Sequence, residues 1–234
     1  MIRPPELNLD PVFGNNSWVQ IGEAIARDEV PNTWIVGSEK TIALTNGGPL
    51  TLQIYGINHD DLVGTGKARF TLGLQNLTAF QRQMNPTAAN VGSFAGAQLS
   101  GWLNSELWNL LPADLREIIK PVRKRTSSGN LSSAIRTDTM SIFCFSEIEV
   151  TGAFNDAGNP SFPGEGERYP IFVQGLTPLV KRLNNGAGDE VHWWFRSPSS
   201  VRNDVFVGVN RSIGAASGLL ANNVGSGINF GICI

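Results

Sequence analysis

Three consecutive aromatic residues near the C-terminus, Trp193-Trp194-Phe195, constrain the fold more than any other stretch of the chain. Neighbouring residues of a β-strand point to opposite faces, so Trp193 and Phe195 would lie on one side of a sheet and Trp194 on the other. We therefore predict a central strand that is covered on both faces and stops at Pro198, which cannot donate a ladder hydrogen bond. The alternative use of Trp194 is as an aromatic face that binds a sugar.

Arg196 would stand at the end of this strand, where its five donors can join carbonyls or a carboxylate into one network. Glu147 and Glu149 lie two residues apart in a segment interpreted as a strand, so their side chains would share a face. We expect one of them to accept Arg196 in a buried, bidentate ion pair. The predicted structural core consists of Trp102, Glu147, Glu149, Trp193, Trp194 and Arg196.

A low content of charge indicates a rigid, loop-rich protein with a neutral polar surface. Charged residues make up 16% of the chain, whereas about 25% is usual. The formal net charge of −2 argues against nucleic acid as a partner, because phosphate binding needs a positive field. The one basic cluster, at 120–125, is interpreted as a solvated helix end.

Two further features bear on location. The longest uncharged run, 212–234, is interrupted by Gly, Asn and Ser, so we predict no membrane insertion. Residues 1–5 lead directly into polar sequence and do not resemble a signal peptide.

Cys144 and Cys233 both lie in apolar runs. Two buried free thiols are favoured over a disulfide, although the sequence alone does not decide between them.

The pattern predicts a single domain over 17–234, preceded by an extended N-terminal arm over 1–16 that contains three prolines. A helix begins at Ser17, where Gln20 completes a capping-box pattern. A β-hairpin is expected over 41–57 and an αα-hairpin over 97–119. Further strands are expected at 34–36, 67–74, 139–145, 169–174, 205–209 and 228–234, and irregular loops at 122–133, 153–168 and 212–227. The fold class is therefore α+β, with a mixed, mainly antiparallel sheet.

The segment His59-Asp60-Asp61 is the strongest candidate for a ligand site outside this core. A metal usually needs three or four ligands from separated positions, and the chain has only 2 His, so no metal is predicted. The simpler interpretation is that Asp60 or Asp61 accepts backbone N–H groups in a turn or pairs with a buried Arg.

We predict no catalytic residue and no cofactor. The chain has no Gly-x-Ser-x-Gly elbow. A Ser/His/Asp triad would have to recruit His59 or His192, and His192 directly precedes the predicted core strand. Two glutamates on one face of one strand are poorly placed to flank a glycosidic bond.

Five segments, in order, resemble an uncharacterised domain of bacteriophage tail and virion proteins and of bacterial surface proteins. In that family they read approximately GFNHDD, WLN, SExEV, WWLRSP and FGFCI, and here they lie at 56–61, 102–104, 146–150, 193–198 and 230–234. The resemblance runs from about Trp34 to the last residue. It departs at Ser100, where the family commonly has Arg, and at Gly92-Ser93-Phe94, where the family has GGW. The layout is also similar to C-type-lectin and formylglycine-generating-enzyme-like folds.

The resemblance implies a non-catalytic virion component of a tail, baseplate or fibre. Such a protein would be made in the host cytoplasm and released within a particle. Its partners would be other virion proteins, to which the 1–16 arm would anchor it, further copies of itself, and a host glycan contacted through Asp60, Asp61 or Trp194. A carbohydrate-binding module of the C-type-lectin type and a capsid decoration protein are the alternatives.

Overall fold

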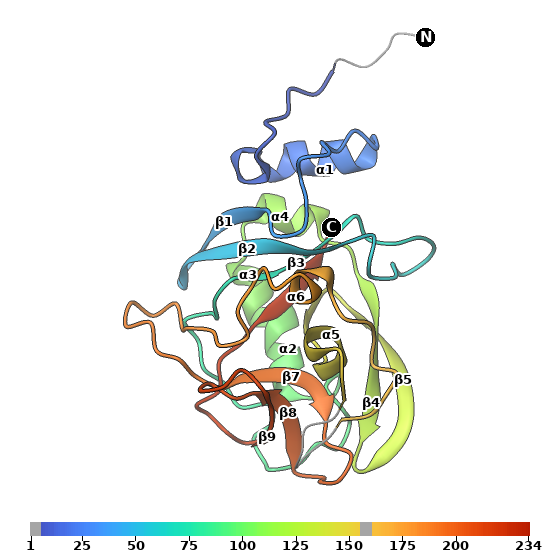
Figure 1. Cartoon of the computed structure of the whole chain (residues 1–234), viewed down its shortest axis with the longest axis vertical. Helices are drawn as coiled ribbons and strands as arrows, with labels where there is room; N and C mark the ends of the chain where they lie inside the picture. The colour runs from blue at the N-terminus through green and yellow to red at the C-terminus, as the bar shows by residue number, and fades with distance from the viewer. Residues whose placement is uncertain (1–5, 155–160) are drawn as a thin grey trace.

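The computed structural model describes residues 6–154 and 161–234, and it confirms a mixed α+β fold whose sheets are antiparallel (Figure 1). One sheet has five strands in the order β1 (Glu39–Leu44), β2 (Gly48–Ile57), β3 (Phe70–Leu74), β10 (Phe230–Cys233) and β6 (Ile142–Cys144). A second has three, β7 (Trp193–Pro198), β8 (Val205–Val209) and β9 (Ala216–Leu220). The remaining pair is a long hairpin of β4 (Val122–Gly129) and β5 (Ser132–Met140).

The helices are short and lie around these sheets (Figure 1). An almost continuous helical rod consists of α2 (Gln98–Trp102), the π-helical stretch η2 (Leu103–Leu107) and α3 (Trp108–Leu110). Pro112 then caps α4 (Ala113–Ile118), so the predicted pair of helices is confirmed. The others are η1 (Phe13–Asn15), α1 (Trp18–Ala26), α5 (Glu147–Thr151) and α6 (Pro170–Val173). None of the helices within the described residues is long and apolar enough to cross a membrane.

The N-terminal segment folds onto the chain's own body as far as the structure describes it. Ser17 and Gln20 form the expected capping box at the start of α1. Phe13, before that helix, is buried and packs edge-on against Trp18, Trp34 and Phe70. The expected arm therefore contacts the domain itself over residues 6–16, and its first five residues lie outside the described ones.

Three segments differ from the sequence-based prediction. Residues 34–36 form turns rather than a strand, with Trp34 buried and Ile35 exposed. The stretch 122–133, interpreted as a connector and a solvated basic cluster, builds most of the β4–β5 hairpin, whose turn residues Asn130 and Leu131 both have positive φ. Residues 169–174 are helical in α6, because Pro170 occupies a first-turn position where its missing N–H costs nothing.

The aromatic strand β7 is fully buried, but it is not central in its sheet as predicted. It is the end strand of the β7–β8–β9 sheet. Its outer edge is covered by other segments, since the Trp194 N–H donates to the Gly227 carbonyl at 3.3 Å and the Arg196 N–H donates to the Phe145 carbonyl at 2.9 Å. The strand stops at Pro198, as expected. This covering is what allows three bulky aromatics and a guanidinium to follow one another in the core.

Close packing of Tyr55 on β3 gives a stability prediction. A Cβ added at Gly73 would lie 2.4 Å from the Tyr55 ring. The ring cannot retreat, because its hydroxyl donates to the Leu74 carbonyl at 2.6 Å and accepts from Asn229. We expect Gly73→Ala to lower the free energy of unfolding by about 1–3 kcal/mol, measured by denaturant melts.

The matched control is Gly101→Ala in α2, where an added Cβ meets no atom within 4 Å. This change should leave stability unchanged or raise it by up to about 1 kcal/mol, since Ala is the better helix former. Equal effects at the two glycines would contradict the packing described here.

Candidate functional site

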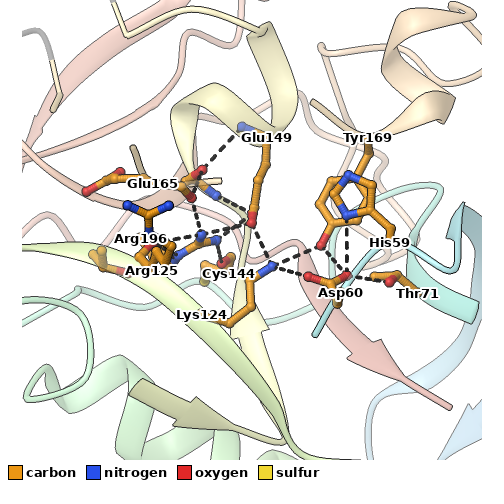
Figure 2. A network of polar contacts seen from close by, with 12 residues as sticks. His59, Asp60, Thr71, Lys124, Arg125, Cys144, Glu149, Glu165, Tyr169 and Arg196 are labelled. Carbon is orange, nitrogen blue, oxygen red and sulfur yellow. Dashed lines mark hydrogen bonds and ion pairs between the residues drawn. The ribbon is translucent and has the colours of Figure 1, made fainter. Parts of the chain in front are cut away.

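Arg196 is the centre of a buried polar network at the end of β7 (Figure 2). Its guanidinium grips Glu149 with both terminal nitrogens, at 2.5 Å from Nη1 to Oε2 and 2.8 Å from Nη2 to Oε1. It also donates to the backbone carbonyls of Cys144 at 3.1 Å and Glu165 at 2.6 Å, and through Nε to the Thr126 hydroxyl at 3.0 Å. The bidentate pair expected from the sequence is therefore present, with Glu149 as the acceptor.

Glu149 reaches Arg196 from a helix rather than from the predicted strand. Ser146 is the N-cap of α5 and accepts from the Glu149 backbone N–H, while the Glu149 carboxylate accepts from the Ser146 N–H at 2.9 Å. This capping box and the left-handed Gly152 at the other end fix one short helical turn. Glu147 points elsewhere, and its carboxylate accepts the Ser161 N–H at 3.2 Å.

Lys124 extends the network from Glu149 to Asp60. Its ammonium lies 2.6 Å from Glu149 Oε1 and 2.6 Å from Asp60 Oδ1, and it donates to the Tyr169 hydroxyl at 3.0 Å. The other oxygen of Asp60 accepts from Thr71 at 2.5 Å and from Tyr169 at 2.7 Å. The expected partner of Asp60 was a backbone N–H or a buried Arg, and the structure corrects this to the buried Lys124.

Asp61 takes no part in the buried network. Its exposed carboxylate pairs with Lys67 at 2.9 Å on the surface. His59 stacks on Tyr169 with ring centroids 4.1 Å apart, and its Nδ1 lies 3.7 Å from Asp60 Oδ2. The three residues of the His59-Asp60-Asp61 segment therefore have three different environments, and no group of metal-ligating side chains gathers there or elsewhere among the residues that the structure describes.

Neighbouring cations determine the protonation states of the two buried carboxylates, Asp60 and Glu149. Burial raises the pKa of Asp60, but the charge of Lys124 and the hydrogen bonds to the carboxylate outweigh this and hold the pKa well below its usual value. Burial also raises the pKa of Glu149, and the charges of Arg196 and Lys124 lower it below its usual value. Two carboxylates and two cations thus form an ionised chain with no net charge.

Glu165 behaves differently from these two carboxylates. It accepts from the Ser127 N–H at 2.7 Å and from the Ser197 hydroxyl, but no side-chain cation pairs with it among the described residues. Burial therefore prevails over the charge of Arg196 and these hydrogen bonds, and raises the pKa of Glu165 to about 7.

The network forms the floor of a cavity of about 370 Å³ between the 59–67 loop, β4 and the 166–167 segment. Arg123, Arg125 and Glu167 stand at its sides together with the Asp61–Lys67 pair. A larger cavity of about 560 Å³ is lined elsewhere by Gln81, Gln83, Gln98, Arg82, Trp102 and Glu106, among others. Trp102 is buried in the core, as predicted, and it also lines this larger cavity, where the Arg82 guanidinium lies 4.2 Å from the centre of its ring.

Trp193 and Trp194 are both completely buried. The Trp193 indole donates to the Leu179 carbonyl at 2.9 Å and the Trp194 indole to the Arg82 carbonyl at 2.7 Å. The alternative in which Trp194 presents a face to a sugar is therefore wrong, because both the ring and its N–H are already occupied.

Sequence reasoning missed Lys124, Tyr169 and Glu165. Alternation offered a signal for the first, since buried Val122, Lys124 and Thr126 alternate with exposed Arg123 and Arg125 along β4. Glu165 lies within the irregular loop predicted at 153–168, of which residues 155–160 lie outside the described ones, and Tyr169 directly follows it. No periodicity there marks a buried residue.

The potential nucleophiles here are committed to other contacts. Ser197 donates to Glu165 and accepts the Glu147 N–H at 2.9 Å, so its partner is a carboxylate and not a histidine. Cys144 and Cys233 are buried free thiols. Burial raises the pKa of Cys144 to about 12 and that of Cys233 well above its usual value, so both remain protonated. The arrangement is suited to holding segments together.

Replacing Arg196 tests this structural role. We expect Arg196→Ala to lower the free energy of unfolding by about 3–5 kcal/mol in a denaturant melt, because it leaves buried Glu149 without its bidentate partner. Arg202→Ala is the matched control, since Arg202 binds Asp204 with a similar two-pronged contact at the protein surface. That variant should melt like the parent chain, and a mild effect at Arg196 would contradict the assigned role.

Glu165 predicts a pH dependence with a definite sign. Its folded pKa of about 7 lies above the ordinary 4.5, so the folded state holds the proton more tightly than the unfolded chain. Its contribution to stability is therefore complete below pH 4.5 and is lost as the pH rises to about 7. We expect Glu165→Gln to remove this loss when unfolding free energies are compared across that range.

The control is Glu167→Gln, which changes an exposed neighbour. It should follow the parent curve. If the stability curves of Glu165→Gln and the parent chain ran parallel, the raised pKa of Glu165 would be contradicted.

Comparison with known proteins gives one match. A family model described as a domain of unknown function, DUF6273, matches residues 68–227, which is more than half of the chain. This region includes β3, α5, β7 and the network residues Thr71, Lys124, Glu149, Tyr169 and Arg196, whereas His59 and Asp60 lie outside it. Neither the curated proteins nor the solved structures compared with the chain contain a match.

Proposed function

The chain belongs to the DUF6273 family, and we propose that it is a non-catalytic structural component of a bacteriophage virion. The observation that carries the non-catalytic part is the state of the buried network. Asp60 and Glu149 are each engaged by Lys124, and Glu149 also by Arg196, so neither carboxylate is available as a base. A fully compensated buried network fixes the relative positions of segments, which suits a rigid building block.

The virion part of the proposal rests on the sequence resemblance to tail and virion proteins. Within a particle, the position would be in the tail, baseplate or fibre, with capsid decoration as the alternative. The C-type-lectin-like layout also remains a prediction. Contact with a host glycan would fall to the cavity lined by Gln81, Gln83 and Gln98, whose side-chain amides also hydrogen-bond within the chain, and not to buried Trp194.

The proposed anchoring of the chain to other subunits by the 1–16 arm can be tested through residues 1–5. Residues 6–16 already contact this domain, since Trp34 donates to the Asp10 carbonyl at 3.1 Å and Phe13 is buried. A truncation that removes only residues 1–5 would therefore leave these contacts intact.

The proposal predicts that the chain is a constituent of purified particles. We expect mass spectrometry to detect it in particles banded on a density gradient from a host that carries its gene, and immunogold labelling to place it on the tail. A variant that lacks residues 1–5 should melt normally and be depleted from these particles. Absence of the full-length chain from particles that contain their other structural proteins would refute the proposal.

A further inference from the structure

Among the residues that the structure describes, the outer edge of β5 is the longest strand edge without a backbone partner. β5 spans nine residues and pairs with β4 along one side. Within the described ranges 6–154 and 161–234, no backbone hydrogen bond or bridge joins residues 132–139 to a segment other than β4. Figure 1 shows the strand along one side of the molecule. Its residues before Met140 are exposed or half-buried.

Two other strand edges of the protein are covered. Asn104 caps β6, because its amide donates to the Ile142 carbonyl at 2.9 Å and accepts the Ile142 N–H at 3.0 Å. Residues of η1 lie against β1, where Lys40 donates to the Gly14 carbonyl at 3.1 Å. An open edge is a template for pairing with another strand, and proteins usually block it with proline, lysine or a covering loop. β5 contains no proline and no lysine.

The charged residues of β5 are complementary to those of a second, antiparallel copy of β5. Arg136 and Asp138 are its two charged residues, and they flank Thr137. In the single chain, Arg136 donates to Asp138 Oδ1 through Nε at 3.0 Å and Nη2 at 2.7 Å. Asp138 Oδ2 accepts no hydrogen bond from the described residues. A second β5 that runs antiparallel, with Thr137 opposite Thr137, would place each Arg136 opposite the Asp138 of the other copy.

Neighbouring registers lack this match. Moving the centre to Arg136 would set the two arginines opposite each other, and moving it to Asp138 would set the two aspartates opposite each other. Like charges directly across an antiparallel pair are destabilising, whereas unlike charges stabilise it. The charge pattern therefore selects one register.

We propose that β5 pairs with β5 of a second copy of this chain, antiparallel and centred on Thr137, to form a two-fold symmetric dimer. The same surface on both copies is what a two-fold interface requires. This inference rests on the proposed function, because it identifies how one building block meets the next. The added strand pairs would turn the β4–β5 hairpin into a continuous four-stranded sheet.

Charge exchange tests the register. The parent chain should dimerise with rising concentration in sedimentation velocity experiments. Arg136→Asp and Asp138→Arg should each raise the dimer dissociation constant tenfold or more, because each sets like charges opposite each other. An equimolar mixture of the two variants should dimerise again, since one copy then carries two acidic and the other two basic residues.

Several results would overturn the inference. They are a parent chain that stays monomeric at the highest soluble concentration, variants that dimerise as well as the parent, and a mixture that does not recover. Melting curves of each variant show whether it is folded.

Cross-linking tests the centre of the interface directly. Thr137→Cys would place two thiols opposite each other at the two-fold axis, and the natural cysteines, Cys144 and Cys233, are buried. Mild oxidation should yield a disulfide-linked dimer from this variant. In the same register, the two copies of exposed residue 133 lie eight residues apart along the strand, or about 27 Å. The control Ser133→Cys should therefore remain largely uncross-linked, and equal cross-linking of both variants would overturn the register.

The two proposals can fail separately. If the chain is present in particles but stays monomeric, the β5 interface is wrong and the virion assignment stands. If it dimerises through β5 but is absent from particles, the virion assignment is wrong and the interface stands.

Discussion

The bidentate contact between Arg196 and Glu149 connects secondary-structure elements that hydrogen bonds within the sheets do not connect. Arg196 belongs to β7 and Glu149 to α5, and the same guanidinium donates to carbonyls at Cys144 in β6 and Glu165 in the following loop. Two sheets, a helix and a loop therefore converge on one side chain. Because the guanidinium is completely buried, each of these contacts is made without competition from water.

Burial of this charge is tolerated because the network is extended and balanced. Taking an isolated ion pair out of water costs several kcal/mol per ion, and only good geometry with additional hydrogen bonds offsets it. Here Lys124 and Asp60 continue the alternation of charge, and Tyr169 and Thr71 satisfy the remaining oxygen of Asp60. No side-chain cation pairs with Glu165 among the described residues, which explains why its pKa is raised while the pKa values of Asp60 and Glu149 are lowered.

The contrast between the interior and the β4–β5 hairpin connects the fold with the proposed role. The inner residues of β4, among them Lys124 and Thr126, are held by the network, so the hairpin is firmly attached along this strand. Its other strand, β5, has an outer edge to which no described segment is hydrogen-bonded through the backbone. A rigid domain with one exposed strand edge is suited to assembly, because little conformational entropy is lost when that edge binds a partner.

Local signals in the sequence predicted local structure well. The Ser17–Gln20 capping box, the hairpin over 41–57 and the end of β7 at Pro198 were all readable, because each depends on neighbouring residues. The hairpin turn itself lies at 45–47, since Gly48 and Pro49 already pair within β2. The capping box at Ser146 and Glu149 has the same pattern as the one at Ser17, but it was read as a strand because Ile148 and Val150 favour one.

The long-range pairs could be inferred only in part. Arg196 was expected to find a carboxylate, because a cation after three buried aromatics needs one. The contact of Asp60 with Lys124 spans 64 residues, and it depends on how the hairpin folds against the five-stranded sheet. No spacing within the sequence encodes that arrangement.

The most direct measurement of the central claim is a double-mutant cycle on Arg196 and Glu149, with Arg196→Met and Glu149→Leu made singly and together. If the pair joins these segments as described, each single change leaves a buried charge without its bidentate partner. The loss of stability in the double variant is then smaller than the sum of the two single losses by about 2 kcal/mol or more. Losses that add to within about 0.5 kcal/mol would show that the two residues act independently, and would contradict the account.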